Sequence, residues 1–140
     1  MKSMNQTYTS FLTVVAIFFT FLFMPNGEPD LTGKSTTVIG VSPDSLKKDH
    51  LIFVFIPTCG KCRKAAVQVE KLFERDSNVT GLTAEDFQGD IKELRDSFNI
   101  TFPILTTDKP RLKTYFRHIP RFVYVHDSLI TAVLDSLKVE

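Results

Sequence analysis

The chain of 140 residues contains no tryptophan and only two cysteines. Two cysteines are too few for a scaffold of several disulfides or for a zinc site built from four thiolates. The net charge of +1 argues against a polybasic protein that binds nucleic acid and against an acidic tail. Internal repeats and low-complexity tracts are also absent. The hydrophobic fraction of 43% and the charged fraction of 24% are typical of a folded protein, so we expect one domain with a short additional segment.

Apolar residues are concentrated near the N-terminus, where residues 11–24 read FLTVVAIFFTFLFM without a charge. A run of this length is typical of a signal-peptide core, and extended back to Tyr8 it reaches about 17 residues, the lower limit for a membrane-spanning helix. Cleavage of a signal requires small side chains, which the residues around Pro25 do not supply. We therefore favour an uncleaved anchor, with secretion after cleavage as the alternative. No cysteine follows the run, which excludes a lipoprotein.

Three regions are expected along the chain. Residues 1–25 form the anchor or signal segment, residues 26–36 form a polar linker with proline and glycine, and residues 37–140 form the folded domain. Lys2 indicates that the N-terminus lies in the cytoplasm. The domain is then expected on the extracytoplasmic side, in the periplasm or at the cell surface.

The pattern of the domain predicts alternating strands and helices that end in a β-hairpin. Residues 51–56, LIFVFI, form a continuous apolar run that is typical of a buried central strand. From Gly60 onward the apolar residues recur with helical spacing. The other predicted elements are extended segments at 37–41, 78–82, 102–105, 121–126 and 129–133, and helices at 83–98, with Thr83 as the N-cap, and at 109–117. This order predicts an α/β domain with a mixed sheet flanked by helices.

The two cysteines lie where the predicted central strand gives way to the helix. Cys59 and Cys62 are separated by Gly60 and Lys61, and this spacing on a first helical turn lets the sulfurs reach bonding distance. The helix N-terminus and the nearby Lys61 favour a thiolate at Cys59. We therefore predict that Cys59 is an exposed nucleophile with a low pKa and that Cys62 is the resolving thiol of a disulfide-exchange reaction.

Three other roles for the cysteine pair stay open. A structural disulfide is one, although so short a closed loop adds little stability. A zinc site is another, and it would need further ligands from His50, His118 or His126. The third is a pair of buried cysteines without a function. The junction of strand and helix favours redox chemistry over all three.

Ile119 and Pro120 directly precede the predicted strand RFVYV. Proline is rare in the interior of a sheet, so Pro120 marks either the start of the strand or a cis bend. Taken alone, an ordinary proline at a strand edge is the simpler interpretation.

Taken together, the segments LIFVFIPTCGKCRK, ITFPILTTD and IPRFVYVHDSLI resemble the thioredoxin superfamily. The best match is its exported, membrane-anchored TlpA/ResA-like branch of thiol-disulfide oxidoreductases. The resemblance spans most of residues 51–130 and implies a thioredoxin-like fold in which Pro120 is a cis-proline facing the cysteines. It implies a redox-active disulfide between Cys59 and Cys62, and substrate contacts at Pro120, Ile119 and Thr58.

The chain departs from the family pattern around the proposed groove and at the C-terminus. Thr58 stands where tryptophan is usual, Lys61 where proline is frequent, and Arg121 where threonine follows the cis-proline. The arginine changes the charge of the groove. The last helix of the family is expected to be absent or reduced to residues 132–137, which leaves part of the sheet less covered.

Groups that move protons in related proteins are also replaced. Ala65 stands where some members carry a glutamate, and Phe53 stands where thioredoxins carry a buried acid. Water, or His118 if it folds close, is then the expected proton acceptor for Cys62.

The sequence thus predicts a thiol-disulfide oxidoreductase that exchanges disulfides with exported client proteins. The dithiol carries the electrons itself, so no cofactor and no metal are expected. The expected partners are protein thiols or disulfides, a redox donor or acceptor, and the membrane through the N-terminal helix, with no nucleic acid. Ile119 before the cis-proline resembles the reducing members, which favours a reductase.

Several other functions are weighed against this one. Cys59, Cys62 and a histidine could bind copper(I), although related copper-delivery proteins space their cysteines by three residues. A thioredoxin-fold domain that only binds partners is a further alternative. A peroxidase of the peroxiredoxin type needs a PxxxTxxC arrangement, which the segment Pro57-Thr58-Cys59 does not fit.

Overall fold

The computed structural model describes residues 28–137. The described chain begins with two 3₁₀ turns, η1 (Thr36–Ile39) and η2 (Pro43–Ser45), followed by β1 (Asp49–Val54), α2 (Gly60–Arg75) and β2 (Val79–Ala84). It continues with the 3₁₀ turn η3 (Glu85–Phe87), α3 (Gln88–Phe98), β3 (Ile104–Thr107), α4 (Lys109–Tyr115), β4 (Arg121–His126) and β5 (Leu129–Leu134). The anchor predicted for residues 1–25 lies outside the described residues. No helix within 28–137 has the length and apolar character needed to cross a membrane.

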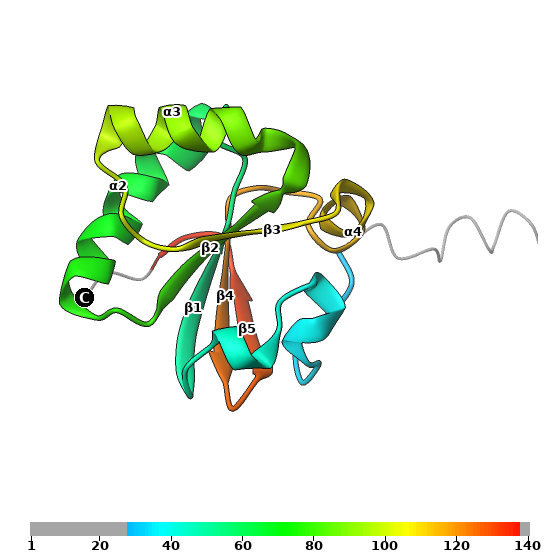
Figure 1. Cartoon of the computed structure of the whole chain (residues 1–140). Coiled ribbons are helices and arrows are strands. Elements are labelled where there is room, and N and C mark those ends of the chain that lie inside the picture. Colours follow the sequence, from blue (N-terminus) through cyan, green and yellow to red (C-terminus); the bar gives the residue numbers. More distant parts are fainter. Residues whose placement is uncertain (1–27, 138–140) are drawn as a thin grey trace, which may run out of the picture.

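The strands form one mixed sheet in the order β3-β2-β1-β4-β5 (Figure 1). The first three strands are parallel, and β4 runs antiparallel beside β1 with Val54 opposite Arg121. Helices α2 and α3 lie together on one side of the sheet, whereas α4 and the turns of residues 36–45 lie on the other (Figure 1). The predicted mixed sheet flanked by helices is therefore confirmed.

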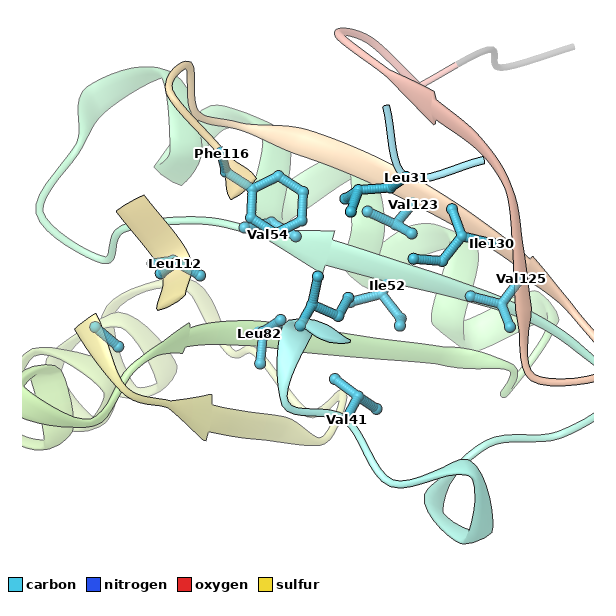
Figure 2. Close-up of a cluster of buried hydrophobic side chains, with 12 residues drawn as sticks. Leu31, Val41, Ile52, Val54, Leu82, Leu112, Phe116, Val123, Val125 and Ile130 are labelled. Atoms are coloured by element: carbon cyan, nitrogen blue, oxygen red, sulfur yellow. The ribbon is translucent and has the colours of Figure 1, made fainter. Parts of the chain in front are cut away.

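Strand β1 is buried on both faces and divides the interior into two hydrophobic clusters. Ile52 and Val54 contribute to the cluster on the α4 side, where Figure 2 shows them near Leu31 and Val123. Phe53 contributes to the cluster beneath α2. Burial of both faces explains why the strand is apolar throughout rather than alternating.

The cluster beneath α2 is built largely from aromatic rings. Phe53 stacks on Phe55 and on Phe122, with ring centroids 4.9 and 5.4 Å apart. Phe102 meets Phe53 edge to face at 6.2 Å. These rings fill the space under the helix that carries the two cysteines.

Two predicted elements are wrong. Residues 37–41, predicted as a strand, lie in η1 and its cap, where the Ser35 side chain accepts the Thr37 N–H and Gly40 ends the turn with φ +83°. Thr83, predicted as a helix N-cap, is a fully buried residue of β2 that pairs with Thr106, and α3 begins only at Gln88. The capping contacts of η1 are local, whereas the pairing partner of Thr83 is supplied by a distant part of the chain.

The segment 28–36, which composition predicts as a linker, packs against the domain. Leu31 is 2% exposed in the α4-side cluster. The Gly33 N–H donates to the Ile130 carbonyl at 2.7 Å, and the Ile130 N–H donates to the Lys34 carbonyl at 2.9 Å. This segment therefore extends the edge of the sheet beside β5, because backbone pairing needs no apolar side chains.

No helix follows β5 within residues 28–137, and residues 132–134, part of the range suggested for a reduced last helix, belong to β5. A cavity of about 700 Å³ lies between α2 and the sheet in this region, at the end of the sheet that carries His50 and His126. Leu72, Tyr124 and Leu137 are among the residues that line it. Part of the α2 side of the sheet is therefore less covered.

Candidate functional site

Cys59 is the N-cap residue of α2, just beyond the end of β1. Its backbone is extended (φ −79°, ψ 127°), and its carbonyl accepts the Arg63 N–H at 3.0 Å, which opens the helix. Its own N–H donates to the Ile56 carbonyl at 3.1 Å, which closes the turn after the strand. The side chain is half-buried, while Thr58 before it is exposed. The fold thus presents the Cys59 sulfur at the edge of the domain.

Cys62 lies one turn further along α2 and is 1% exposed. The Ile56 N–H donates to its sulfur at 3.5 Å. Both cysteines are free thiols, and their side chains are joined by a hydrogen bond. The structure therefore brings the two predicted sulfurs together in the reduced state.

The two thiols have opposite pKa shifts. Burial of the Cys59 thiol opposes its ionisation, but the backbone and thiol of Cys62 and the N–H and charge of Lys61 outweigh that cost and lower the pKa of Cys59. Burial raises the pKa of Cys62 to about 12; the Ile56 N–H opposes this rise, and the neighbouring Cys59 sulfur adds to it. The thiolate is therefore more favoured at Cys59 than at a free cysteine, and at neutral pH Cys62 is a neutral thiol.

The peptide bond between Ile119 and Pro120 is cis, so the predicted cis bend is confirmed. Both residues are half-buried and directly precede β4. Val54 at the end of β1 lies opposite Arg121 at the start of β4. The cysteine turn, which follows β1, and the cis bend, which precedes β4, therefore lie at the same end of the sheet. Ile119 also packs against the hydrophobic cluster that contains Cys62.

All five predicted site residues thus lie at one end of the sheet: Cys59, Cys62, Thr58, Ile119 and Pro120. Their contacts with a substrate stay a prediction.

Two of the histidines considered as metal ligands lie at the opposite end of the sheet. His50 is at the start of β1, where its Nε2 lies 2.7 Å from Thr80 Oγ1, and His126 pairs with Asp49. The ring of His50 has a lowered pKa, because burial and the Lys47 charge outweigh the attraction of Asp76. Within residues 28–137, no three side chains of His, Cys, Asp or Glu gather into a group that could hold a metal ion.

Two acidic residues with shielded contacts were missed by the sequence reasoning. Glu70 on α2 is 7% exposed, and its Oε2 accepts the N–H groups of Thr101 and Phe102 at 2.9 and 3.2 Å. Its position four residues after Ala66 on the apolar face was the available signal. Glu28 contacts Arg121, with Nε to Oε2 at 3.1 Å, and nothing in the sequence pattern joins these distant positions.

No protein-family model matches the chain, and no curated protein matches it in sequence. Solved structures do share its fold. A secreted Mycobacterium tuberculosis disulfide oxidoreductase homologous to E. coli DsbE superimposes with a TM-score of 0.57 and 17% identity, over 76% of this chain and 84% of that one.

Two further solved structures give the same result. The thioredoxin domain of a Bacteroides vulgatus thiol-disulfide oxidoreductase has a TM-score of 0.57 and 19% identity, over 75% of this chain and 83% of that one. StoA from Bacillus subtilis has a TM-score of 0.56 and 16% identity, over 79% and 90% of the two chains. The described domain therefore has the thioredoxin-like fold that the sequence predicts.

Proposed function

We propose that this thioredoxin-like domain is a thiol-disulfide oxidoreductase that reduces disulfides of exported client proteins through Cys59 and Cys62. The observation that carries the proposal is the asymmetry of the pair at the start of α2. Cys59 is partly exposed and has a lowered pKa, whereas Cys62 is 1% exposed and has a pKa raised to about 12. The described activities of structures with the same fold add support.

The first step is attack of the Cys59 thiolate on a client disulfide. A sulfur–sulfur bond forms between Cys59 and the client, the client disulfide breaks, and the released client thiolate takes up a proton. Cys62 then loses its proton and attacks the Cys59 sulfur, which forms the Cys59–Cys62 disulfide and releases the second client thiol. Counted from the Cys59 thiolate and the Cys62 thiol, the pair has lost two electrons and one proton, and the second proton that the client takes up comes from solvent. A redox donor must return the electrons.

We assign Thr58, Ile119 and Pro120 to client binding, since they border Cys59 at the same end of the sheet. In this assignment the backbone of Ile119 faces the client chain, and Pro120 shapes the groove. The resemblance of Ile119 to the corresponding residue of reducing members supports reduction as the direction.

We also propose that residues 1–25 hold the domain on the extracytoplasmic side of a membrane, in the periplasm or at the cell surface. The uncharged apolar run of residues 11–24 supports this assignment. A structure of the same fold is described as secreted, which agrees with export.

The reduction potential of the cysteine pair tests the function. The full-length chain, purified in a mild detergent, is equilibrated with dithiol or glutathione buffers, and free thiols are counted by alkylation and mass. A value near about −270 mV is expected for a reductant of client disulfides, while one near about −120 mV would reverse the proposed direction.

Two further results would contradict disulfide exchange itself. If no disulfide forms between Cys59 and Cys62 at any reduction potential of the buffer, the oxidoreductase proposal is wrong. If Cys59→Ser leaves the biological function of the full-length protein intact, the domain only binds its partners.

A further inference from the structure

Glu28 holds the loop that carries the cis-proline, although it lies 90 residues before His118. Its Oε1 accepts the His118 N–H at 2.7 Å, and its Oε2 accepts from Arg121 Nε at 3.1 Å. The backbone of Arg117 adds a further hydrogen bond. One carboxylate is therefore bonded to residues on both sides of Ile119 and Pro120.

The contact is shielded from solvent. The Arg121 side chain is 13% exposed and the Glu28 side chain 18%. Ion pairs that are partly buried are screened less by salt than pairs on the open surface. Burial opposes the charge of Glu28, but the hydrogen bonds and Arg121 outweigh it and lower the pKa of Glu28. The carboxylate is therefore ionised at neutral pH.

The loop of residues 117–120 lies outside the regular backbone pairing of the sheet, between the end of α4 and the start of β4. Pro120 has no N–H to donate. Arg121 is held a second time by Asp135, at 2.9 Å, but that carboxylate is 84% exposed. The Glu28 carboxylate thus supplies shielded polar contacts on both sides of Ile119 and Pro120.

We propose that Glu28 is a positioning residue for client binding, which holds the backbone of Ile119 and Pro120 in place beside Cys59. The inference rests on the proposed oxidoreductase function. In this proposal Glu28 supports binding of a client peptide chain beside Ile119 and Pro120. The thiol chemistry itself is carried out by the cysteines at the start of α2. Loss of Glu28 should then weaken reactions with protein clients and spare reactions with small disulfides that need no groove.

Glu28→Gln in the full-length chain tests the proposal. The variant keeps the size of the side chain and removes the charge that pairs with Arg121. With insulin as the protein disulfide and dithiothreitol as the electron donor, we expect KM to rise by about tenfold, the loss of about 1.4 kcal/mol of binding. The rate with the small disulfide 5,5′-dithiobis(2-nitrobenzoate) and the reduction potential should stay unchanged.

Asp30→Asn is the matched control. It removes one carboxylate charge two residues further on, where the side chain bonds within its own turn to the Thr32 N–H at 2.9 Å. This variant should behave as the wild type in both assays. Equal KM values for Glu28→Gln and Asp30→Asn would overturn the proposal, and so would an equal loss of rate with insulin and with the small disulfide.

Arg121→Gln provides a second route if Glu28→Gln does not fold. It breaks the same pair from the other side, so it should raise KM for insulin and spare the small disulfide. In a double variant the combined effect should be smaller than the sum of the two single effects, because both variants break the contact between Glu28 and Arg121. Additive effects would contradict the proposal. A wild-type chain that reduces neither substrate overturns the proposed function itself, and the positioning role with it.

Discussion

At the scale of the residue, Cys59 and Cys62 show how two side chains of the same type acquire different reactivities. They are joined by a hydrogen bond, yet one has a lowered pKa and the other a pKa raised to about 12. The difference follows from position on the first helical turn. Cys59 meets the charged and N–H groups of the helix start, whereas Cys62 is withdrawn among apolar side chains, where a charge is costly.

The two thiols should therefore be modified at very different rates. In the fully reduced full-length chain, iodoacetamide should modify Cys59 with a rate that rises with pH and reaches half its maximum at a lower pH than for a free cysteine, because the pKa of Cys59 is lowered. Cys62 should stay protonated, and hence unmodified, up to a pH near its pKa of about 12. Peptide mass mapping across a pH series measures both rates.

Cys59→Ser is the control for this assignment. Its remaining thiol should resist modification at neutral pH. Equal modification of both cysteines in the wild type would contradict the predicted division of roles.

At the scale of the element, α2 is held to its surroundings near both ends by polar side chains. Near its start, Arg63 Nε donates to the Pro57 carbonyl at 2.9 Å and its guanidinium pairs with Glu93 of α3 at 3.3 Å. Further along, Glu70 binds the backbone of the loop that leads into β3. These contacts hold the helix that carries both cysteines to the turn before it, to α3 and to the loop before β3.

Removal of the Glu70 carboxylate should destabilise the domain. Glu70→Ala leaves the N–H groups of Thr101 and Phe102 without their acceptor, which should cost about 2–3 kcal/mol of unfolding free energy. Urea unfolding of the full-length chain, followed by circular dichroism, measures the loss. Glu74→Ala, an exposed glutamate on the same helix, should change the stability by less than about 0.5 kcal/mol.

The elements with a strong local pattern could be predicted from the sequence. The apolar run of β1, the helical spacing of α2 and the alternation of β4 each depend on residues that are close together in the chain. The extension of β2 through Thr83 depends on a partner far away, because Thr83 pairs with Thr106. The cysteine pair could be predicted because its residues are close together in the chain. The contacts of Glu28 could not be predicted, because its partners lie about 90 residues further along the chain.

At the scale of the whole molecule, one sheet separates two hydrophobic clusters, and the chain before η1 completes one of them. Leu31 fills the α4-side cluster near Val123 and Ile130 (Figure 2). The segment that composition predicts as a linker is thereby part of the folded unit.

Leu31→Ala tests whether this segment contributes to stability. Truncation of a leucine that is 2% exposed should cost about 2–4 kcal/mol of unfolding free energy, because it leaves a cavity in the cluster. Chemical denaturation measures the cost, with the exposed Thr32→Ala as the matched control. A Leu31→Ala variant as stable as the control would mean that residues 28–36 act as a linker after all.

The attachment of Glu28 to the cis-proline loop also limits where the dithiol can work. If residues 1–25 form the proposed anchor, only three residue steps separate Pro25 from Glu28, a reach of about 10 Å in a fully extended chain. So short a tether would keep the reactive end of the domain against the lipid surface. Its substrates would then be disulfides in the membrane-proximal parts of neighbouring proteins, and a longer spacer inserted before Glu28 would extend its range to clients further from the bilayer.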